Sequence, residues 1–413
     1  MDLDARDLAT LAGERGDAAR QAIELLIAVG RSESAPRLID VVSGHIDGCL
    51  FHGVAGVDFA ERLVEGGGEV AIPTTLNVSS LDLLHPGLYR GDPGIAVLAK
   101  RLMDAYVTLG CRQTWTCAPY QLPDRPAPGA QIAWGESNAI VFANSVLGAR
   151  TNRYGDFLDI CAALTGRVPE TGLHTDDGRR ATLVVEVRLP DGVLAQEIAY
   201  PLIGHALGRV AGVDLPVIIG LNPAEATEDR LKNLGAAAAS AGAVAMFHAV
   251  GVTPEAPELD AVLAPTEPRR VVLDSIALHE ARAELSRPTG RLGAISVGTP
   301  HMSITEMREL AALVAGRSTR LPFYANTARH VLDQAQEEGI VEVIEAAGVR
   351  LVTDTCTYVT PIMGDIDGDL MTNSGKLAYY APANLGANVA LASLADCVES
   401  AMAGETILTG TWA

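Results

Sequence analysis

The chain has 413 residues, enough for two or three domains, and 48% of them are hydrophobic while 20% are charged. That balance supports a large buried core and excludes a disordered chain. The 31 Lys and Arg residues against 51 Asp and Glu give a formal charge of −20. Such a surface repels phosphate backbones and anionic lipids, which argues against nucleic-acid-binding and membrane-surface roles.

The N-terminus, Met1–Asp4, is acidic and lacks the basic and apolar regions of a secretory signal. The most apolar long stretch, Gly235–Val252, is rich in Ala and Gly, so it suits a small-residue helix and a buried strand better than a membrane span. We therefore expect a cytoplasmic protein. Cysteines far apart in such a chain favour free core thiols, or a metal or catalytic role, over disulfides. There are six: Cys49, Cys111, Cys117, Cys161, Cys356 and Cys397.

Short β-branched runs alternate with amphipathic runs along the chain. The predicted strands are Leu38–Val42, Glu69–Ile72, Thr182–Arg188, Pro216–Ile219, Val244–His248, Gly293–Val297 and Val349–Thr353. The predicted helices are Ala18–Val29, Val57–Val64, Gly94–Leu109, Asn138–Leu147, Ser303–Val314 and Thr327–Ala347. Ser303 and Glu306 have the spacing of a capping box. The alternation predicts an α/β protein of several three-layer units, with mainly parallel sheets covered on both faces.

Pro- and Gly-rich segments at 119–129, 254–268 and 361–375 mark boundaries or active-site loops. They suggest three α/β domains, at residues 1–125, 126–265 and 266–413. No Gly-x-Gly-x-x-Gly follows a predicted strand, so nothing indicates a dinucleotide site. Asp365–Asp369 resembles the start of a calcium loop, but Lys376 occupies the position where a bidentate Glu is required.

Three predicted loops after strands contain residues that a packed core does not need: Thr116–Tyr120, Gly298–Ser303 and Thr353–Cys356. Ligand crevices of α/β sheets lie beyond the carboxyl ends of strands, so these loops can converge. A convergence of Cys117 and Cys356 would give soft thiolate ligands suited to iron–sulfur or zinc. The alternative is that each thiol only fills the core.

Two further segments are rich in groups that bind anions. Glu136–Asn138 begins a predicted helix that ends near Arg150 and Arg153, and Met371–Lys376 combines hydroxyl, amide and ammonium groups around a glycine. The alternatives are a helix end exposed to solvent and an ordinary surface lysine. The chain has three lysines.

Gly135–Ala139 also approximates a nucleophile elbow with Ser137 as the nucleophile of a hydrolase. The last histidine, His330, falls inside a helical pattern with no acidic residue placed to orient it, which weighs against that alternative. His45 and His174 follow strand or loop signals, and either could serve a site or simply hydrogen-bond within a loop.

Taken together, these segments resemble the aconitase X family, over nearly the whole chain from about residue 43. The resemblance rests on 45–50, Pro73–Asn77, Thr116–Tyr120, Glu136–Arg153, Thr171–His174, Thr299–Ser303, Asp354–Cys356 and Thr372–Lys376. It implies an aconitase-like body of three α/β units, a cysteine-bound iron–sulfur cluster and loss of water from a small hydroxy acid. It also implies a swivelling small domain, which is expected here as a separate small subunit.

One position departs from the pattern of archaeal members, which are similar to mevalonate 5-phosphate dehydratase and have Cys where this chain has Thr299. The resemblance then implies a 2Fe–2S cluster, or a third ligand such as Cys49 or Cys397. It favours the bacterial members that convert cis-3-hydroxy-L-proline to Δ1-pyrroline-2-carboxylate. A phosphomevalonate-type large subunit remains the alternative.

The resemblance also implies roles for particular side chains. Cys117 and Cys356 would bind the cluster or a single iron, which acts as a Lewis acid on the leaving oxygen. Ser374 or His45 would transfer the proton. The carboxylate or ring nitrogen of the substrate would be held by a set of polar residues: Ser137, Asn138, Arg153, Ser303, Asn373 and Lys376.

Overall fold

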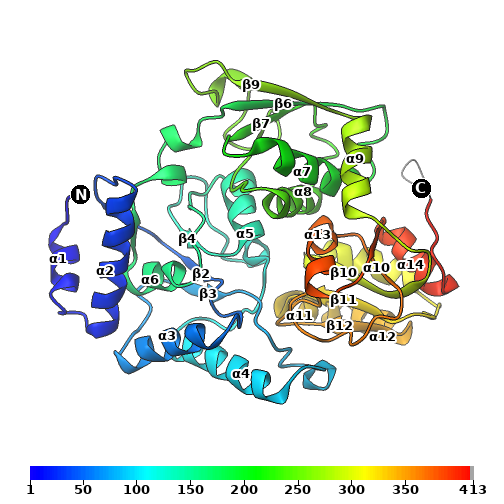
Figure 1. Cartoon of the computed structure of the whole chain (residues 1–413), viewed down its shortest axis with the longest axis horizontal. Helices are drawn as coiled ribbons and strands as arrows, with labels where there is room; N and C mark the ends of the chain where they lie inside the picture. Colours follow the sequence, from blue (N-terminus) through cyan, green and yellow to red (C-terminus); the bar gives the residue numbers. More distant parts are fainter. Residues whose placement is uncertain (410–413) are drawn as a thin grey trace. The chain divides into compact units, whose positions relative to one another are not determined.

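Two bodies of packed structure form from segments that are not contiguous in the sequence. The computed structural model describes residues 1–409 (Figure 1). Unit 1 consists of residues 1–81 and 92–180, and unit 2 consists of residues 82–91 and the chain from 181 onward. The last four residues of the predicted 266–413 domain lie outside the described residues. Segment 82–91 therefore leaves unit 1 and returns to it within ten residues.

Unit 1 contains a three-stranded parallel sheet in the order β3-β2-β4 and an antiparallel pair, β1-β5. Its strands are β1 Leu38–Asp40, β2 Gly44–Ile46, β3 Thr74–Leu76, β4 Ala133–Trp134 and β5 Arg167–Pro169. Its helices are α1 Ala5–Leu11, α2 Asp17–Ser32, α3 Val54–Glu65, α4 Pro93–Thr108, α5 Ser137–Phe142 and α6 Leu158–Thr165, with a π-helical turn η3 Ala143–Leu147 and short 3₁₀ turns η2 Pro119–Gln121, η4 Gly172–His174 and η5 Asp177–Arg179.

The helices of unit 1 form where the sequence supplies an apolar stripe and a capping residue. In α2, Ile23 and Ile27 are one turn apart and both buried, and they pack with Leu38 of β1. The α4 helix begins at Pro93 after the Asp92 side chain, which accepts the backbone N–H of Gly94 and of Ile95. These two helices were predicted from the sequence and are confirmed.

His174 of unit 1 is hydrogen-bonded within a loop. Its Nδ1 lies 2.6 Å from Gln131 Oε1 and its Nε2 lies 2.5 Å from the Tyr154 hydroxyl. A neutral ring satisfies both contacts, because Nδ1–H donates to the amide oxygen and Nε2 accepts from the phenol. Burial, together with the nearby Arg179 and Arg150, lowers the pKa of His174 to about 4. The ring is therefore uncharged at neutral pH.

This histidine predicts a loss of stability in acid. The ring titrates near 6.5 in the unfolded chain, so protons favour unfolding between pH 6.5 and 4. We expect the free energy of unfolding to fall by up to about 3 kcal/mol from this group over that interval. Urea unfolding at a series of pH values measures it, and His174→Gln should flatten part of the curve. An identical pH dependence in the variant would contradict the expectation.

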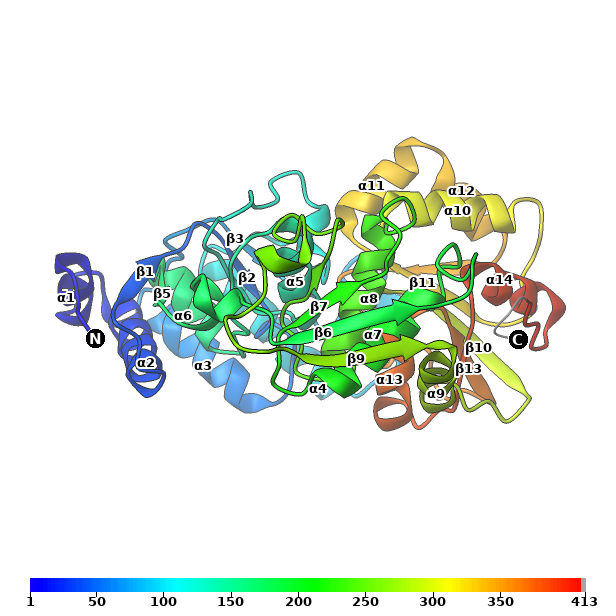
Figure 2. The same cartoon turned by 90° about the horizontal axis from the view of Figure 1, so that it is seen from above.

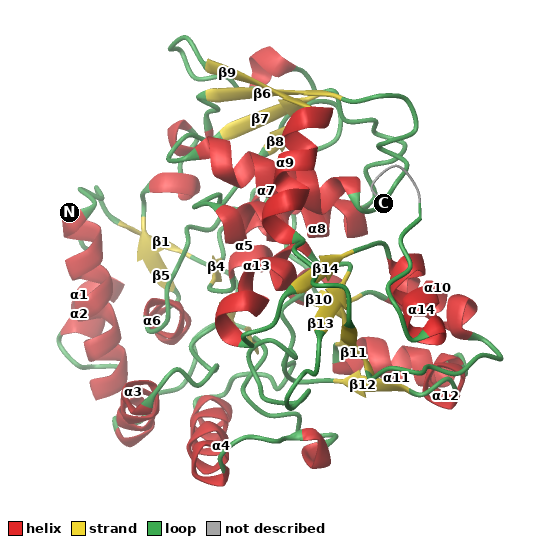
Figure 3. Cartoon of the chain, turned by 45° about the vertical axis from the view of Figure 1, so that its right-hand side comes forward, coloured by secondary structure: helices red, strands yellow, loops and turns green. Residues whose placement is uncertain are grey.

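Unit 2 contains two parallel sheets, one of four strands in the order β8-β7-β6-β9 and one of five in the order β12-β11-β10-β13-β14 (Figure 3). The four-stranded sheet and its helices comprise β6 Leu183–Arg188, α7 Ala199–Ala211, β7 Pro216–Ile219, α8 Glu228–Ala241, β8 His248–Ala249, β9 Arg269–Asp274 and α9 Ser275–Leu285. The remainder comprises β10 Leu292–Met302, α10 Ile304–Val314, β11 Phe323–Thr327, α11 Arg329–Glu337, α12 Ile340–Ala346, β12 Val349–Val352, β13 Asp369–Thr372, α13 Gly375–Asn384, β14 Val389–Leu391 and α14 Leu394–Ala403, with 3₁₀ turns η1 Pro86–Leu88 and η6 Leu259–Ala261.

Helices cover both faces of the five-stranded sheet. Side chains of α10, α11, α12 and α14 form one apolar cluster with the strands, centred on residues such as Val297 and Phe323. Figure 2 shows α13 on the opposite side of this sheet from α10, α11 and α12. The sheets run mainly parallel, as predicted, and among the strands of residues 1–409 only the short β1-β5 pair is antiparallel. The predicted fold class is therefore confirmed.

The α7 and α8 helices approach each other closely because glycines face the contact. A Cβ placed on Gly204 would lie 2.1 Å from the carbonyl oxygen of Leu234, and one on Gly208 would lie 2.6 Å from that of Ala238. Only a residue without a side chain fits there. The Ala- and Gly-rich stretch that begins at Gly235 is thus part of a helix, as predicted, but the strand expected at Val244–His248 is displaced: β8 is His248–Ala249 and shares only His248 with it.

Two further predicted elements are wrong in detail. Glu69–Ile72 is not a strand: Val70 N–H bonds to Leu109 O and Ala71 N–H to Ala163 O, so this segment pairs with helix ends instead of a ladder. The predicted helix Thr327–Ala347 is two helices, because Gly339 takes a left-handed conformation (φ +69°) between them. No helix within residues 1–409 has the length and apolar character needed to cross a bilayer.

Candidate functional site

In unit 2, two potential metal ligands meet at the ends of parallel strands. His301 lies near the end of β10, and Cys356 follows β12 after three residues. A ring nitrogen of His301 and the Cys356 sulfur lie within 4.8 Å of each other, and both residues are buried. Imidazole nitrogen and thiolate sulfur are the donors that suit iron–sulfur centres and zinc. His301 is not among the ligands predicted from the sequence.

The His301 ring has a defined tautomer. Its Nε2 lies 3.1 Å from the carbonyl oxygen of Thr355, which only accepts, so Nε2 carries the proton and Nδ1 keeps its lone pair. Burial lowers the pKa of His301 to about 4, which keeps the ring neutral. A neutral imidazole with a fixed lone pair is the form that binds a metal.

The loop that carries Cys356 is anchored by charged side chains. Arg329 donates two hydrogen bonds of 2.6 Å to the Asp354 carboxylate, which also accepts Leu83 N–H at 3.1 Å. Asp82 accepts both the N–H (2.9 Å) and the hydroxyl (3.0 Å) of Thr353. Asp354 has φ +61°, a conformation rare for residues with a side chain. These bonds hold the strained turn next to the thiol.

The ends of the neighbouring strands β10 and β13 bring Thr299 and Ser374 together. Ser374 Oγ donates to the Thr299 carbonyl oxygen and accepts Leu377 N–H at 3.0 Å, so it is the N-cap of α13. Lys376 is buried in the first turn of α13, and Asn373 is partly exposed. Thr299 Oγ1 is buried with no hydrogen-bond partner among residues 1–409. Polar side chains thus gather at the carboxyl ends of these two strands.

A buried lysine connects the same edge to α8. Lys232 donates to Asp229 Oδ1 at 3.0 Å, to Glu306 Oε2, and to the His301 carbonyl oxygen at 3.4 Å. Ser303 belongs to this network, since its hydroxyl donates to Asp229 and accepts Glu306 N–H in the predicted capping box. The Ser303 hydroxyl is therefore occupied by structural bonds.

In unit 1, Cys117 and Asn138 are in direct contact. The Asn138 amide donates to the Cys117 carbonyl oxygen at 3.0 Å and accepts the Tyr120 hydroxyl at 2.7 Å. Glu136 caps α5 by accepting Ala139 N–H at 2.8 Å. Ser137 Oγ lies 3.3 Å from Glu136 Oε1, where a hydrolase would place its histidine base. That contact does not favour the hydrolase alternative.

The other candidates of unit 1 lie in different surroundings. His45 is in β2, with Nδ1 2.8 Å from Thr75 Oγ1, and burial lowers its pKa to about 3. The Cys49 thiol donates to the carbonyl oxygens of Ile46 and Asn77, both at 3.3 Å, and burial raises its pKa. Arg153 is exposed and forms no ion pair within the described chain.

Cys397 of α14 belongs to the apolar cluster under the five-stranded sheet, and burial raises its pKa. Within residues 1–409, neither Cys49 nor Cys397 belongs to a group of His, Cys, Asp or Glu side chains compact enough to hold a metal ion. Both are protonated packing thiols in this structure.

Models of known protein families match most of the chain, in three consecutive segments. Family models described as the aconitase X first, second and third domains match residues 1–177, 181–283 and 292–403. The chain belongs to the aconitase X family. The crystal structure of Thermococcus kodakaraensis aconitase X in its holo form matches with a TM-score of 0.88 and 33% identity, over 97% of this chain and 100% of that one. The family assignment from sequence is confirmed.

Three curated relatives are informative. Cis-3-hydroxy-L-proline dehydratase of Pseudomonas aeruginosa is 42% identical over 98% of this aconitase X chain and 70% of its own length. The enzyme of that name from Hypocrea jecorina is 40% identical, over 98% and 69%. The phosphomevalonate dehydratase large subunit of Thermococcus kodakarensis is 35% identical, over 90% and 92%. The aconitase X chain is therefore a dehydratase, a hydro-lyase.

Proposed function

We propose that this aconitase X chain dehydrates cis-3-hydroxy-L-proline to Δ1-pyrroline-2-carboxylate. The observation that carries the proposal is the higher identity to two dehydratases of that name, 42% and 40%, than to the phosphomevalonate enzyme, 35%. Thr299 supports it, because the resemblance associates a cysteine at this position with the archaeal members. Phosphomevalonate would also require additional cations for its phosphate.

The donor set supports an iron–sulfur cluster, for which we favour the 2Fe–2S type. Cys356 and His301 are buried within 4.8 Å of each other and offer sulfur and nitrogen donors of the required kind. We infer that Cys117 supplies a further thiolate and that Thr355, through its bond to the His301 ring, fixes the orientation of that ligand. Bound there, iron would supply Lewis acidity for departure of the hydroxyl group.

We assign proton transfer to Ser374. Its oxygen accepts Leu377 N–H at the start of the ten-residue helix α13, where the helix dipole favours negative charge. Lys376, buried in the first turn of the same helix, adds a positive charge to this end of it. His45 is the weaker candidate, because a pKa near 3 makes its ring a poor base at neutral pH.

In the reaction, the α-proton passes to the Ser374 oxygen and its electron pair forms a carbon–carbon double bond as the C3–O bond breaks. Ser374, present as its alkoxide before this step, then passes that proton to the released hydroxide, which becomes water, and the enamine product tautomerises to the cyclic imine. We propose that the substrate carboxylate and ring nitrogen are held by Ser137, Asn138, Arg153, Asn373 and Lys376. Ser303 belongs to the same proposed set, and its hydroxyl also bonds to Asp229 and caps α10.

We further propose that a separate small subunit completes the enzyme. Several relatives that this chain covers over 92% or more of their length are named large subunits, which implies a second polypeptide. Free buried thiols suit a reducing compartment, so we place the protein in the cytoplasm.

The test is an anaerobic assay of the protein co-purified with its small subunit, using cis-3-hydroxy-L-proline and, separately, mevalonate 5-phosphate. We expect conversion of the first, seen as the cyclic imine product, and none of the second. Conversion of mevalonate 5-phosphate alone, or of neither compound with iron bound, would overturn the proposed substrate. A fluorophosphonate should leave Ser137 unlabelled, since labelling would favour the hydrolase.

A further inference from the structure

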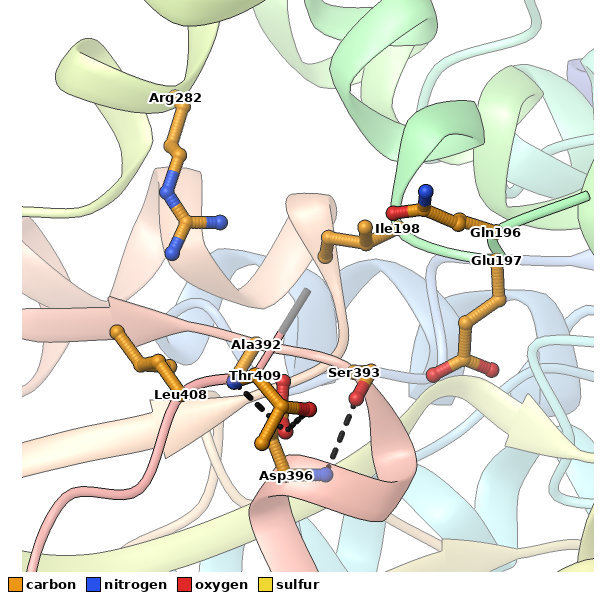
Figure 4. A pocket seen from close by; sticks show the side chains of 9 residues that line it. All are labelled: Gln196, Glu197, Ile198, Arg282, Ala392, Ser393, Asp396, Leu408 and Thr409. Carbon is orange, nitrogen blue, oxygen red and sulfur yellow. Dashed lines mark hydrogen bonds between the residues drawn. The ribbon is translucent and has the colours of Figure 1, made fainter. Parts of the chain in front are cut away.

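A cavity lies in unit 2 and is lined by none of the residues assigned above. It has a volume of about 250 Å³ and is formed by the segment before α7, by α9, by the start of α14 and by the chain near Leu408. Figure 4 shows Arg282 on one side of it, with Ile198 and Glu197 on another and Asp396 at the base. The lining thus combines one cation, two carboxylates and apolar groups.

Arg282 is an unpaired cation. Its side chain is partly buried, and among residues 1–409 it forms no ion pair and no side-chain hydrogen bond. Other arginines that are partly buried have carboxylate partners, as Arg329 has in Asp354. Burial lowers the pKa of Arg282, and only the charge of Asp396 opposes this. A desolvated guanidinium without a partner favours the binding of an anion.

The two carboxylates keep acceptor positions available. Asp396 Oδ1 accepts both the N–H (3.2 Å) and the hydroxyl (2.6 Å) of Thr409, while Oδ2 has no bond to another described residue. Glu197 Oε1 accepts Leu394 N–H, while Oε2 has none. Burial raises the pKa of Glu197, and the negative charges of Glu309 and Asp396 add to this shift. These two oxygens favour a donor that carries positive charge.

We propose that this cavity binds a small zwitterionic amino acid. The carboxylate of the ligand pairs with the Arg282 guanidinium, and its ammonium or iminium nitrogen donates to Asp396 Oδ2 and Glu197 Oε2. Ile198 and Leu408 contact the side chain of the ligand. A simple anion would face two carboxylates, and a simple cation would face Arg282, so each alone is disfavoured.

The size of the cavity agrees with this class of ligand. About 250 Å³ is just below the range of roughly 300–1,000 Å³ that is typical of drug-sized ligands. A peptide or nucleotide is therefore too large, and a free amino acid is suitable. The site does not depend on the proposed function, since none of its residues belongs to the proposed catalytic machinery.

Isothermal titration calorimetry of the full chain with L-proline tests the proposal, with acetate and methylammonium as single-charge probes. We expect one L-proline per chain, with each single-charge probe binding at least about tenfold more weakly. Arg282→Gln and Asp396→Asn should each weaken L-proline binding about tenfold or more, as checked on folded protein by circular dichroism. Arg287→Gln, in an arginine just beyond the end of α9 and outside the cavity, should leave it unchanged.

A further variant separates this cavity from the catalytic site. Cys356→Ser disrupts the proposed metal site, and L-proline binding should persist in it. Loss of binding in Cys356→Ser together with full binding in Arg282→Gln would overturn the proposal. So would an affinity for acetate equal to that for L-proline, which would indicate a plain anion site.

Discussion

Replacement of Cys356 by serine is expected to remove both bound iron and dehydratase activity from the anaerobically purified protein. The thiol is buried within 4.8 Å of the His301 ring, and a hydroxyl is a poor ligand for iron that cannot replace the thiolate. We expect the same of Cys117→Ser. Iron and sulfide content and visible absorption measure the cluster directly, so the result does not depend on the assay of turnover.

Matched controls come from the other buried cysteines. Cys49→Ser and Cys397→Ser alter thiols that pack against carbonyl oxygens or apolar side chains, so both variants should keep their iron. Each variant then measures how much iron content changes when a buried cysteine that is not a proposed ligand is replaced. Full iron content in Cys356→Ser, or loss of iron only in Cys49→Ser or Cys397→Ser, would show that the cluster is held elsewhere.

Lys232→Met is expected to give the largest loss of stability. The substitution leaves the partly buried carboxylates of Asp229 and Glu306 without the buried cation they share, and breaking a buried ion pair costs about 3–5 kcal/mol. Burial raises the pKa of Glu306 to about 7 even with Lys232 present, so the unpaired carboxyl will take up a proton in the variant. Urea unfolding followed by circular dichroism gives the change in the free energy of unfolding.

Lys100 provides the matched control. Its ammonium lies 2.5 Å from Asp104 one helical turn away, but both side chains are about half exposed. Such surface pairs contribute about 0–1 kcal/mol to stability, so Lys100→Met should change the free energy of unfolding very little. Adding Glu306→Leu to Lys232→Met should recover part of the lost stability. Equal effects of the two lysine substitutions would contradict a special role for the buried network.

Periodicity predicted the elements that are long or strongly patterned. The helix at Gly94–Leu109 and the strand at Pro216–Ile219 were located within one residue or matched outright. Very short central strands were missed: Gly44–Ile46 and Ala133–Trp134 have too few residues to show an alternating pattern. Their place in a sheet depends on partners that are distant in the chain, which local sequence does not encode.

The sequence located the loops of the site better than the bonds within them. Cys356 was chosen because polar residues follow a predicted strand, and Ser374 because hydroxyl, amide and ammonium groups surround a glycine; both lie just after strands in the structure. Ser303 was chosen for its hydroxyl, yet that hydroxyl is used by Asp229 of a different helix. The residues around Lys232 do not predict its ion pair with Glu306, because Glu306 is 74 positions away in the sequence. The one available signal was the scarcity of lysine.

Because residues 82–91 pack in unit 2, the second and third domains depend on a segment that the gene encodes within the first domain. The second and third family domains span residues 181–283 and 292–403, but Asp82 and Leu83 supply bonds that hold the turn before Cys356. A fragment starting at residue 181 would lack those bonds. The Thr353 N–H would then lose its Asp82 acceptor, three residues before the proposed metal ligand Cys356. If the polypeptide were divided or circularly permuted, residues 82–91 would therefore have to stay on the same chain as the second and third domains for the turn to form.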